Sequence, residues 1–232
     1  MIVRTSETRN APDPGTSHRF STTPCLKFLD SLGKIYGEFM HLEDEGEILG
    51  DETMPNVVLV VDMLRGFLEE GYNLYCGDDT RKIIPKVQAL LDRELANGSK
   101  VLYICDTHLL DDLEFQIFPV HCVEGTAESE IIPELASYPG ERINKQRYSG
   151  FYNTDLDQRL RELGPEKVIV CGVCTDICVL HTTADARNRD YTVEVPSDAV
   201  ATFDPDAHLW ALQHMERILG AKLVTTQPIA SD

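Results

Sequence analysis

The feature that most constrains the fold is an alternation of short apolar, β-branched segments with longer amphipathic ones, from Asn56 onward. The apolar segments are NVVLVVD, KVLYICD, KVIVCGV, YTVEVP and AKLVTT, which begin at residues 56, 100, 167, 191 and 221. Unbroken apolar runs are typical of strands that are buried on both faces, and helices between successive strands favour a parallel order. The pattern therefore predicts an α/β fold.

The segments between these strands have helical spacing of apolar residues. We expect helices over 80–97, 128–136, 154–163 and 205–219, and another continuing from Cys178. A short segment at RINK, residues 142–145, is expected to run toward the edge of the sheet where the strands end. Strands and helices in this order predict a three-layer αβα sandwich around a mainly parallel, Rossmann-like sheet. In such sheets ligands bind beyond the carboxyl ends of the strands, so the residues there are the first candidates for a site.

The first 50 residues fall outside this alternation. Residues 1–24 are polar and have no sustained period, residues 25–41 have the spacing of a short helix, and an acidic stretch follows. We expect an N-terminal extension and acidic linker over residues 1–50 and one core domain over residues 51–232.

Composition narrows the class of protein. The net charge of −18, without a Lys/Arg cluster to offset it, argues against nucleic acid as a partner. Seven cysteines, most of them in or beside apolar strands, fit reduced thiols better than a disulfide framework. We see no apolar run of transmembrane length and no signal-peptide core, and so expect a cytoplasmic protein that does not bind membranes.

The stretch CGVCTDICV, residues 171–179, places Cys178 just after a strand and in the first turn of a helix. Free N–H groups and the positive end of the helix favour a thiolate there, and Asp176 is a plausible N-cap. Cys178 is therefore a candidate nucleophile. The alternative is a small buried hydrophobic residue, which is the role of most free cysteines.

One charged residue lies at the end of the first strand, and another lies in the RINK segment. Asp62 closes the first strand, where it is either a structural cap or a general base. Lys145 is either a solvated surface residue or the cation that completes a trio with Asp62 and Cys178, lowering the pKa of the thiol and stabilising developing charge.

A third strand end carries a concentration of metal-binding side chains. Asp106, His108, Glu114 and His121 lie within sixteen residues of one another. Two imidazoles and two carboxylates form a reasonable set of ligands for a divalent ion, zinc first, with manganese or iron as alternatives. Loops are generally rich in such residues, which is the competing interpretation.

These residues together resemble the cysteine hydrolases of the isochorismatase-like superfamily, and within it the nicotinamidases, over about residues 56–226. The resemblance implies that Asp62, Lys145 and Cys178 are catalytic. It also implies a metal held by Asp106, His108 and His121 in the segment DTH…FPVHCVEGT, with Glu114 added as in some members.

The same resemblance implies further features of the pocket. Phe67, Phe118 and Tyr148 would line it, a cis peptide would join Val173 to Cys174, and the backbone N–H groups of Cys174 and Cys178 would hold an oxyanion. The chain departs from the family pattern at Leu64, where a Gln is common, and in its short metal loop, LLDDLEFQI.

The activity implied is hydrolysis of nicotinamide to nicotinate and ammonia through a thioester on the cysteine, a reaction of NAD metabolism carried out by a homo-oligomer. Two alternatives stay open. One is another amidohydrolase of the superfamily, acting on a carbamoyl, ureido or different heteroaromatic amide. The other is a non-catalytic member that binds a metabolite, against which the intact trio argues.

Overall fold

The computed structural model describes residues 54–226. The chain divides into two units, Met1–Asp51 and Glu52–Asp232, and the described residues belong to the second. The predicted extension over residues 1–50, with its helix over 25–41, lies outside the described residues. No helix within 54–226 has both the length and the apolar character needed to cross a membrane.

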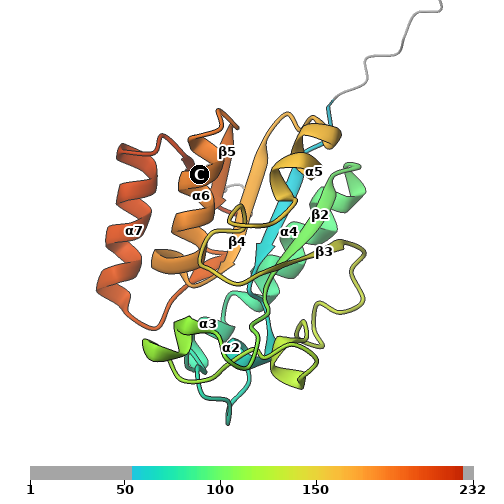
Figure 1. Ribbon diagram of the computed structural model, residues 1–232. Coiled ribbons are helices and arrows are strands. Elements are labelled where there is room, and N and C mark those ends of the chain that lie inside the picture. The colour runs from blue at the N-terminus through green and yellow to red at the C-terminus, as the bar shows by residue number, and fades with distance from the viewer. Residues whose placement is uncertain (1–53, 227–232) are drawn as a thin grey trace, which may run out of the picture. The chain divides into compact units, whose positions relative to one another are not determined.

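A parallel sheet forms the centre of the described domain, as the sequence predicts (Figure 1). Its strands are β1 (Val57–Val61), β2 (Lys100–Asp106), β3 (Glu141–Lys145), β4 (Val168–Val173), β5 (Val193–Pro196), β6 (Val200–Ala201) and β7 (Lys222–Val224). The order is β3-β2-β1-β4-β5-β7, with β6 paired to β4, and all these pairs are parallel.

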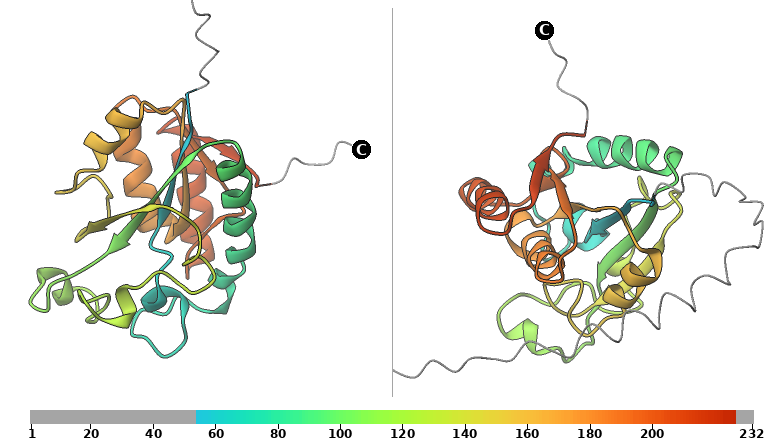
Figure 2. Two further views of the ribbon diagram at one scale, coloured as in Figure 1. Left: turned by 90° about the vertical axis from the view of Figure 1, so that its right-hand side faces the viewer. Right: turned by 90° about the horizontal axis from the view of Figure 1, so that it is seen from above.

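Helices cover both faces of this sheet, which confirms the predicted fold class (Figure 2). The helices are α2 (Arg65–Leu68), α3 (Asp78–Arg81), α4 (Ile84–Ala96), α5 (Leu156–Leu163), α6 (Leu180–Arg187) and α7 (Pro205–Arg217). Val58 and Val60 of β1 pack with α2 and α4, whereas Val57, Leu59 and Val61 pack with α5, α6 and α7. Alternate side chains of a strand point to opposite faces, so an unbroken apolar strand fills both cores.

The helix predicted over 128–136 is wrong. A short 3-10 helix, η2 (Ala127–Ser129), is followed by turns. Pro133 gives the physical reason, because the residue before a proline is pushed out of helical backbone angles. The helix predicted over 80–97 forms as two separate helices, α3 and α4, and a proline occupies the first turn of α4.

The helix after β4 also begins differently from the prediction. Thr175–Val179 forms a π-helical turn that leads into α6, and its N-cap position is Cys174. No side chain caps this turn, so the assignment of Asp176 as an N-cap is wrong. Asp176 lies within the turn instead, two positions after the N-cap residue Cys174, and so too late to accept from the first N–H groups.

Close contact between β4 and β1 requires a glycine at position 172. Gly172 lies opposite Val61 with φ +114°, and a Cβ atom there would lie 2.0 Å from the Val61 carbonyl oxygen. Only glycine adopts such an angle without strain, and the neighbouring atom is backbone that cannot rotate away. This contact sets the spacing of the two strands whose ends carry Asp62 and the Cys178 turn.

We therefore expect Gly172→Ala to lower the free energy of unfolding by at least about 3 kcal/mol, from strain and overpacking together. Gly98→Ala is the control, because Gly98 also has a positive φ, +81°, but a Cβ there has no neighbour within 4 Å. Its cost should be about 1–2 kcal/mol. Equal losses in urea unfolding would show that the close approach of β4 to β1 is unimportant.

Candidate active site

The carboxyl ends of β1, β2, β3 and β4 bring together the three residues proposed as a catalytic trio. Lys145 Nζ lies 2.8 Å from Asp62 Oδ2, 2.7 Å from Asp106 Oδ1 and 3.5 Å from Cys178 Sγ. Asp62 and Lys145 are each 1% exposed and Cys178 is 7% exposed. Lys145 is therefore not a solvated surface residue but a buried cation between two carboxylates and a thiol.

Hydrogen bonds fix the Asp62 carboxylate in place. Its Oδ1 accepts from the backbone N–H of Asp106 at 2.8 Å, and its Oδ2 faces Lys145. The Asp62 backbone has φ 49°, an angle that aspartate tolerates better than most residues. One oxygen thus joins two strand ends, while the other remains beside the thiol and the ammonium.

Burial controls the protonation of the trio. Burial raises the pKa of Asp62, and the charge of Asp106 adds to this, although Lys145 opposes it. Burial also raises the pKa of the Cys178 thiol, again with Lys145 opposing and both carboxylates adding. The position of Cys178 at a helix start predicted a thiolate. Its burial instead favours a neutral thiol beside a carboxylate that can accept the proton.

Lys145 remains charged despite its burial. Desolvation lowers the pKa of its ammonium, but Asp106, Asp62 and Cys178 outweigh that effect and raise the pKa well above the ordinary value. A buried ammonium without such partners would lose its proton.

The turn that carries Cys178 is held by the carbonyl of Cys174. The N–H groups of Ile177 and Val179 donate to this oxygen at 3.1 and 3.2 Å. The Val173–Cys174 peptide is cis, as the family resemblance implies. Cys174 Sγ lies 3.6 Å from Cys76 Sγ, so this second cysteine side chain has a partner outside the trio.

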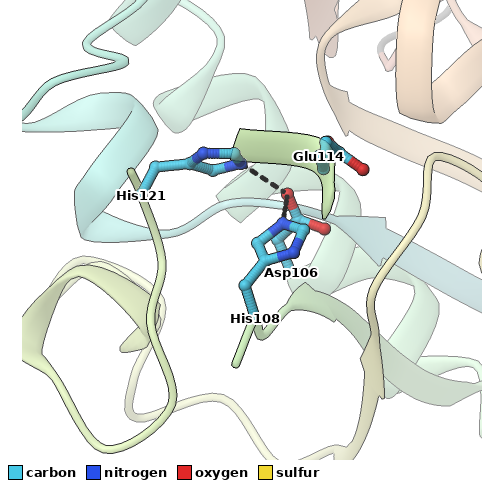
Figure 3. A group of neighbouring side chains, drawn as sticks. All are labelled: Asp106, His108, Glu114 and His121. Atoms are coloured by element: carbon cyan, nitrogen blue, oxygen red, sulfur yellow. Dashed lines mark ion pairs between the residues drawn. The ribbon is translucent and has the colours of Figure 1, made fainter. Parts of the chain in front are cut away.

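The four predicted metal ligands converge beside the trio (Figure 3). One ligand atom from each of Asp106, His108, Glu114 and His121 lies within 4.8 Å of all the others, and all four residues are buried. Asp106 Oδ2 lies 3.3 Å from His108 Nε2 and 3.4 Å from His121 Nε2. Asp106 therefore contacts both imidazoles with one oxygen and Lys145 with the other.

The hydrogen bonds of the imidazoles favour a metal at this point. His108 Nδ1 lies 3.0 Å from Asp112 Oδ2, and His121 Nδ1 lies 2.8 Å from the Pro119 carbonyl oxygen. If each Nδ1 carries the proton, each Nε2 presents a lone pair to the Asp106 carboxylate, and a cation is needed between them. Within residues 54–226, His108 Nε2 and Glu114 Oε2 are buried and have no hydrogen-bond partner.

The charges of the cluster also favour a bound cation. Burial lowers the pKa of His108, but Asp106 and Asp112 outweigh it and raise this pKa to about 9. Burial and the charge of Asp106 raise the pKa of Glu114. The cluster thus stabilises positive charge, and two nitrogen and two oxygen donors suit zinc, with manganese or iron as alternatives.

Residues of the trio and of the metal cluster line one cavity of about 400 Å³. Asp62 and Cys178 come from the trio, and Asp106, Glu114 and His121 come from the cluster, whereas Lys145 and His108 are not part of the lining. The structure also places in its wall the three aromatic residues expected there, Phe67, Phe118 and Tyr148.

Several residues of the wall were not identified from the sequence. They are Asn73, Leu74, Tyr75, Cys76, Val173, Ile177 and Phe203. Four of the seven come from the loop after α2 and one from the loop before α7, where no hydrophobic period or motif marks a residue as part of a pocket. Asp112, which contacts His108, was also missed, although its place two residues before Glu114 was a usable signal.

Comparison with known proteins agrees with this geometry. Residues 56–228 match the Isochorismatase domain family. An uncharacterized isochorismatase family protein PncA of Bacillus subtilis is 33% identical over 181 residues, which cover 73% of this chain and 99% of the relative. The crystal structure of nicotinamidase/pyrazinamidase PncA from Bacillus subtilis has a TM-score of 0.69 at 34% identity and covers 74% of this chain and 100% of its own.

Two further structures show the range of related activities. N-carbamoylsarcosine amidase from Thermoplasma acidophilum has a TM-score of 0.68 at 33% identity and covers 77% of this chain and 100% of its own. Pyrazinamidase of Pyrococcus horikoshii in complex with zinc has a TM-score of 0.68 at 32% identity and covers 73% of this chain and 98% of its own. The match over residues 56–228 shows that this chain belongs to the isochorismatase family.

Proposed function

We propose that this chain is a metal-dependent cysteine amidohydrolase that converts nicotinamide and water to nicotinate and ammonia. One observation carries the proposal: a buried Asp62–Lys145–Cys178 trio and a cluster suited to a metal both contribute residues to the lining of the same aromatic cavity. The likeness to the nicotinamidase PncA of Bacillus subtilis and to the zinc complex of the Pyrococcus horikoshii pyrazinamidase supports it.

In the mechanism, Asp62 takes the proton of Cys178 while the sulfur attacks the carboxamide carbon. The carbonyl oxygen becomes an oxyanion, which the backbone N–H groups of Cys174 and Cys178 stabilise. Asp62 returns its proton to the leaving nitrogen, the C–N bond breaks, and ammonia departs from a thioester. A water then gives a proton to Asp62 and attacks the thioester carbon. The C–S bond breaks, nicotinate is released, and the sulfur takes the proton back from Asp62.

Lys145 holds this arrangement together. Its ammonium contacts both Asp62 and Cys178, so it offsets the negative charge that moves between carboxylate and sulfur. Bound by Asp106, His108, Glu114 and His121, a divalent metal would supply a Lewis acid that fixes the pyridine nitrogen and withdraws electrons from the ring. The attacking atom remains the sulfur of Cys178.

The charges of the cavity distinguish the substrate classes. Its carboxyl side chains come from Asp62, Asp106 and Glu114, and the described residues that line it include no lysine or arginine. A carboxylate on the substrate would therefore face three acidic side chains and no basic side chain in the lining, with the metal as its only cationic neighbour there. The aromatic side chains of Phe67, Phe118 and Tyr148 instead suit a flat, neutral ring. This favours nicotinamide over carbamoyl or ureido acids.

The remaining expectations about setting belong to the same proposal. We propose a cytoplasmic protein of NAD metabolism that forms a homo-oligomer. The six cysteines among residues 54–226 are all free, which suits a reducing compartment. Exposed apolar side chains on the metal loop, at Leu110, Leu113 and Ile117, suit contact between copies.

We further propose that residues 51–232 carry the whole chemistry, and residues 1–50 none of it.

Ammonia release from nicotinamide tests the substrate class directly, with N-carbamoylsarcosine as the anionic comparison. We expect kcat/KM for nicotinamide to be greater by a factor on the order of 100, because an unpaired buried carboxylate costs a few kcal/mol. A strong chelator should remove the activity, and added Zn²⁺ should restore it. Faster turnover of the anionic substrate would contradict the proposed specificity.

The nucleophile is tested with a pair of cysteine variants. Cys178→Ala should lower kcat by about 10⁴-fold or more, because no thioester can form. Cys174→Ala should keep most of the activity, since only its backbone N–H is used. Peptide mapping after alkylation should place the label at position 178. Label at position 174, or near-normal turnover by Cys178→Ala, would show that the nucleophile is assigned wrongly.

The metal site is tested by elemental analysis of His108→Ala. Loss of one of two nitrogen donors should leave the purified protein with little metal, and activity should fall in proportion. His214→Ala is the control, because His214 stacks on Trp210 of α7 and takes no part in the cluster. Full metal occupancy in His108→Ala would mean that the metal is bound elsewhere.

A further inference from the structure

Asp112 contacts two of the four proposed metal ligands and is not itself one of the four. Its Oδ2 lies 3.0 Å from His108 Nδ1, and its Oδ1 accepts from the backbone N–H of Glu114 at 2.9 Å. The second contact makes Asp112 the N-cap of the 3-10 helix η1 (Leu113–Gln116), on which Glu114 lies. One carboxylate therefore reaches one ligand through its ring and another through its backbone.

Arg147 holds this carboxylate from the other side. Its Nη1 donates to Asp112 Oδ1 at 2.9 Å and to Oδ2 at 3.1 Å. The Asp112 side chain is 4% exposed, whereas that of Arg147 is 37% exposed. Both carboxylate oxygens are thus engaged twice, so the side chain has little freedom to turn away from His108.

The contact with His108 decides which ring nitrogen carries the proton. A carboxylate only accepts hydrogen bonds, so it requires a proton on His108 Nδ1, and in the neutral ring this leaves the lone pair on Nε2. Nε2 is the nitrogen that faces Asp106 and the other ligands, and it has no hydrogen-bond partner within residues 54–226. The tautomer set by Asp112 is the one that can bind a metal.

We propose that Asp112 is a positioning residue that sets the metal affinity of the site, by fixing the tautomer of His108 and the placement of Glu114. The proposal rests on the metal site of the proposed function. It assigns to Asp112 no contact with substrate or metal.

Asparagine at this position separates positioning from simple capping. Asn caps a helix about as well as Asp, so Asp112→Asn retains the cap if its oxygen accepts from Glu114. The amide NH₂ then points at His108 Nδ1 and requires it to be an acceptor, which moves the ring proton to Nε2. If the amide is turned the other way, NH₂ opposes the donors of Glu114 and Arg147. Either orientation weakens metal binding while the apo-protein keeps its fold.

The test is zinc binding by the full chain, stripped of metal and titrated with Zn²⁺ against a chromophoric chelator. We expect Asp112→Asn to raise the Kd about 10–100-fold, the usual effect of losing a partner of a metal-bound histidine. Asp111→Asn is the matched control, with the same chemical change at the neighbouring exposed residue, and its Kd should equal that of the unmodified chain. Thermal melting should show that both apo-variants remain fully folded at the temperature of the titration.

Three results would overturn the proposal. An unchanged Kd in Asp112→Asn would show that Asp112 does not position the ligands. An Asp112→Asn apo-protein that is partly unfolded at the titration temperature would show a structural cap alone. No zinc binding by the unmodified chain would remove the metal site, and this role with it. If nicotinamide is not hydrolysed but zinc still binds, only the substrate assignment is wrong, because the zinc titration needs no turnover.

Discussion

The buried ammonium of Lys145 is the interaction on which the rest of the site depends. It contacts Asp62 and Asp106 at 2.8 and 2.7 Å, at the end of three neighbouring strands, with almost no exposure to water. Removing one partner from such a group leaves an uncompensated buried charge, which costs several kcal/mol. The parallel register supports the contact, since Asp106 and Lys145 are paired residues of β2 and β3. The sheet thus places the charges, and the charges hold the strand ends together.

Asp106 extends this interaction into the second half of the site. One of its oxygens faces Lys145 and the other faces His108 and His121, so the trio and the metal cluster share a carboxylate. Any change in charge on one side is therefore felt on the other through a single rigid group. This sharing explains why both sets contribute residues to the lining of one cavity.

The parts of the site predictable from sequence are those fixed by the sheet. Asp62 and Asp106 follow apolar strands, and parallel strands end at one edge, so their proximity follows from pattern alone. Family resemblance added roles for Lys145 and Cys178. Loop geometry was not predictable: the wall formed by Asn73 to Cys76 depends on how a non-repetitive segment folds back, and the segment 128–136 has helical spacing but is broken at Pro133. Local pattern specifies elements, whereas loops follow from tertiary contacts.

The balance of charge in the trio explains how a thiol with a raised pKa suits the proposed role of nucleophile. With Cys178 neutral, Asp62 and Asp106 ionised and Lys145 protonated, these four groups carry one net negative charge. Releasing the thiol proton to solvent would add a second negative charge to a buried site, which desolvation opposes. Passing the proton to Asp62 leaves the net charge unchanged, and the raised pKa of Asp62 makes it a better acceptor. The same burial that suppresses a free thiolate therefore favours transfer within the trio, so that the sulfur gains its charge only as it attacks.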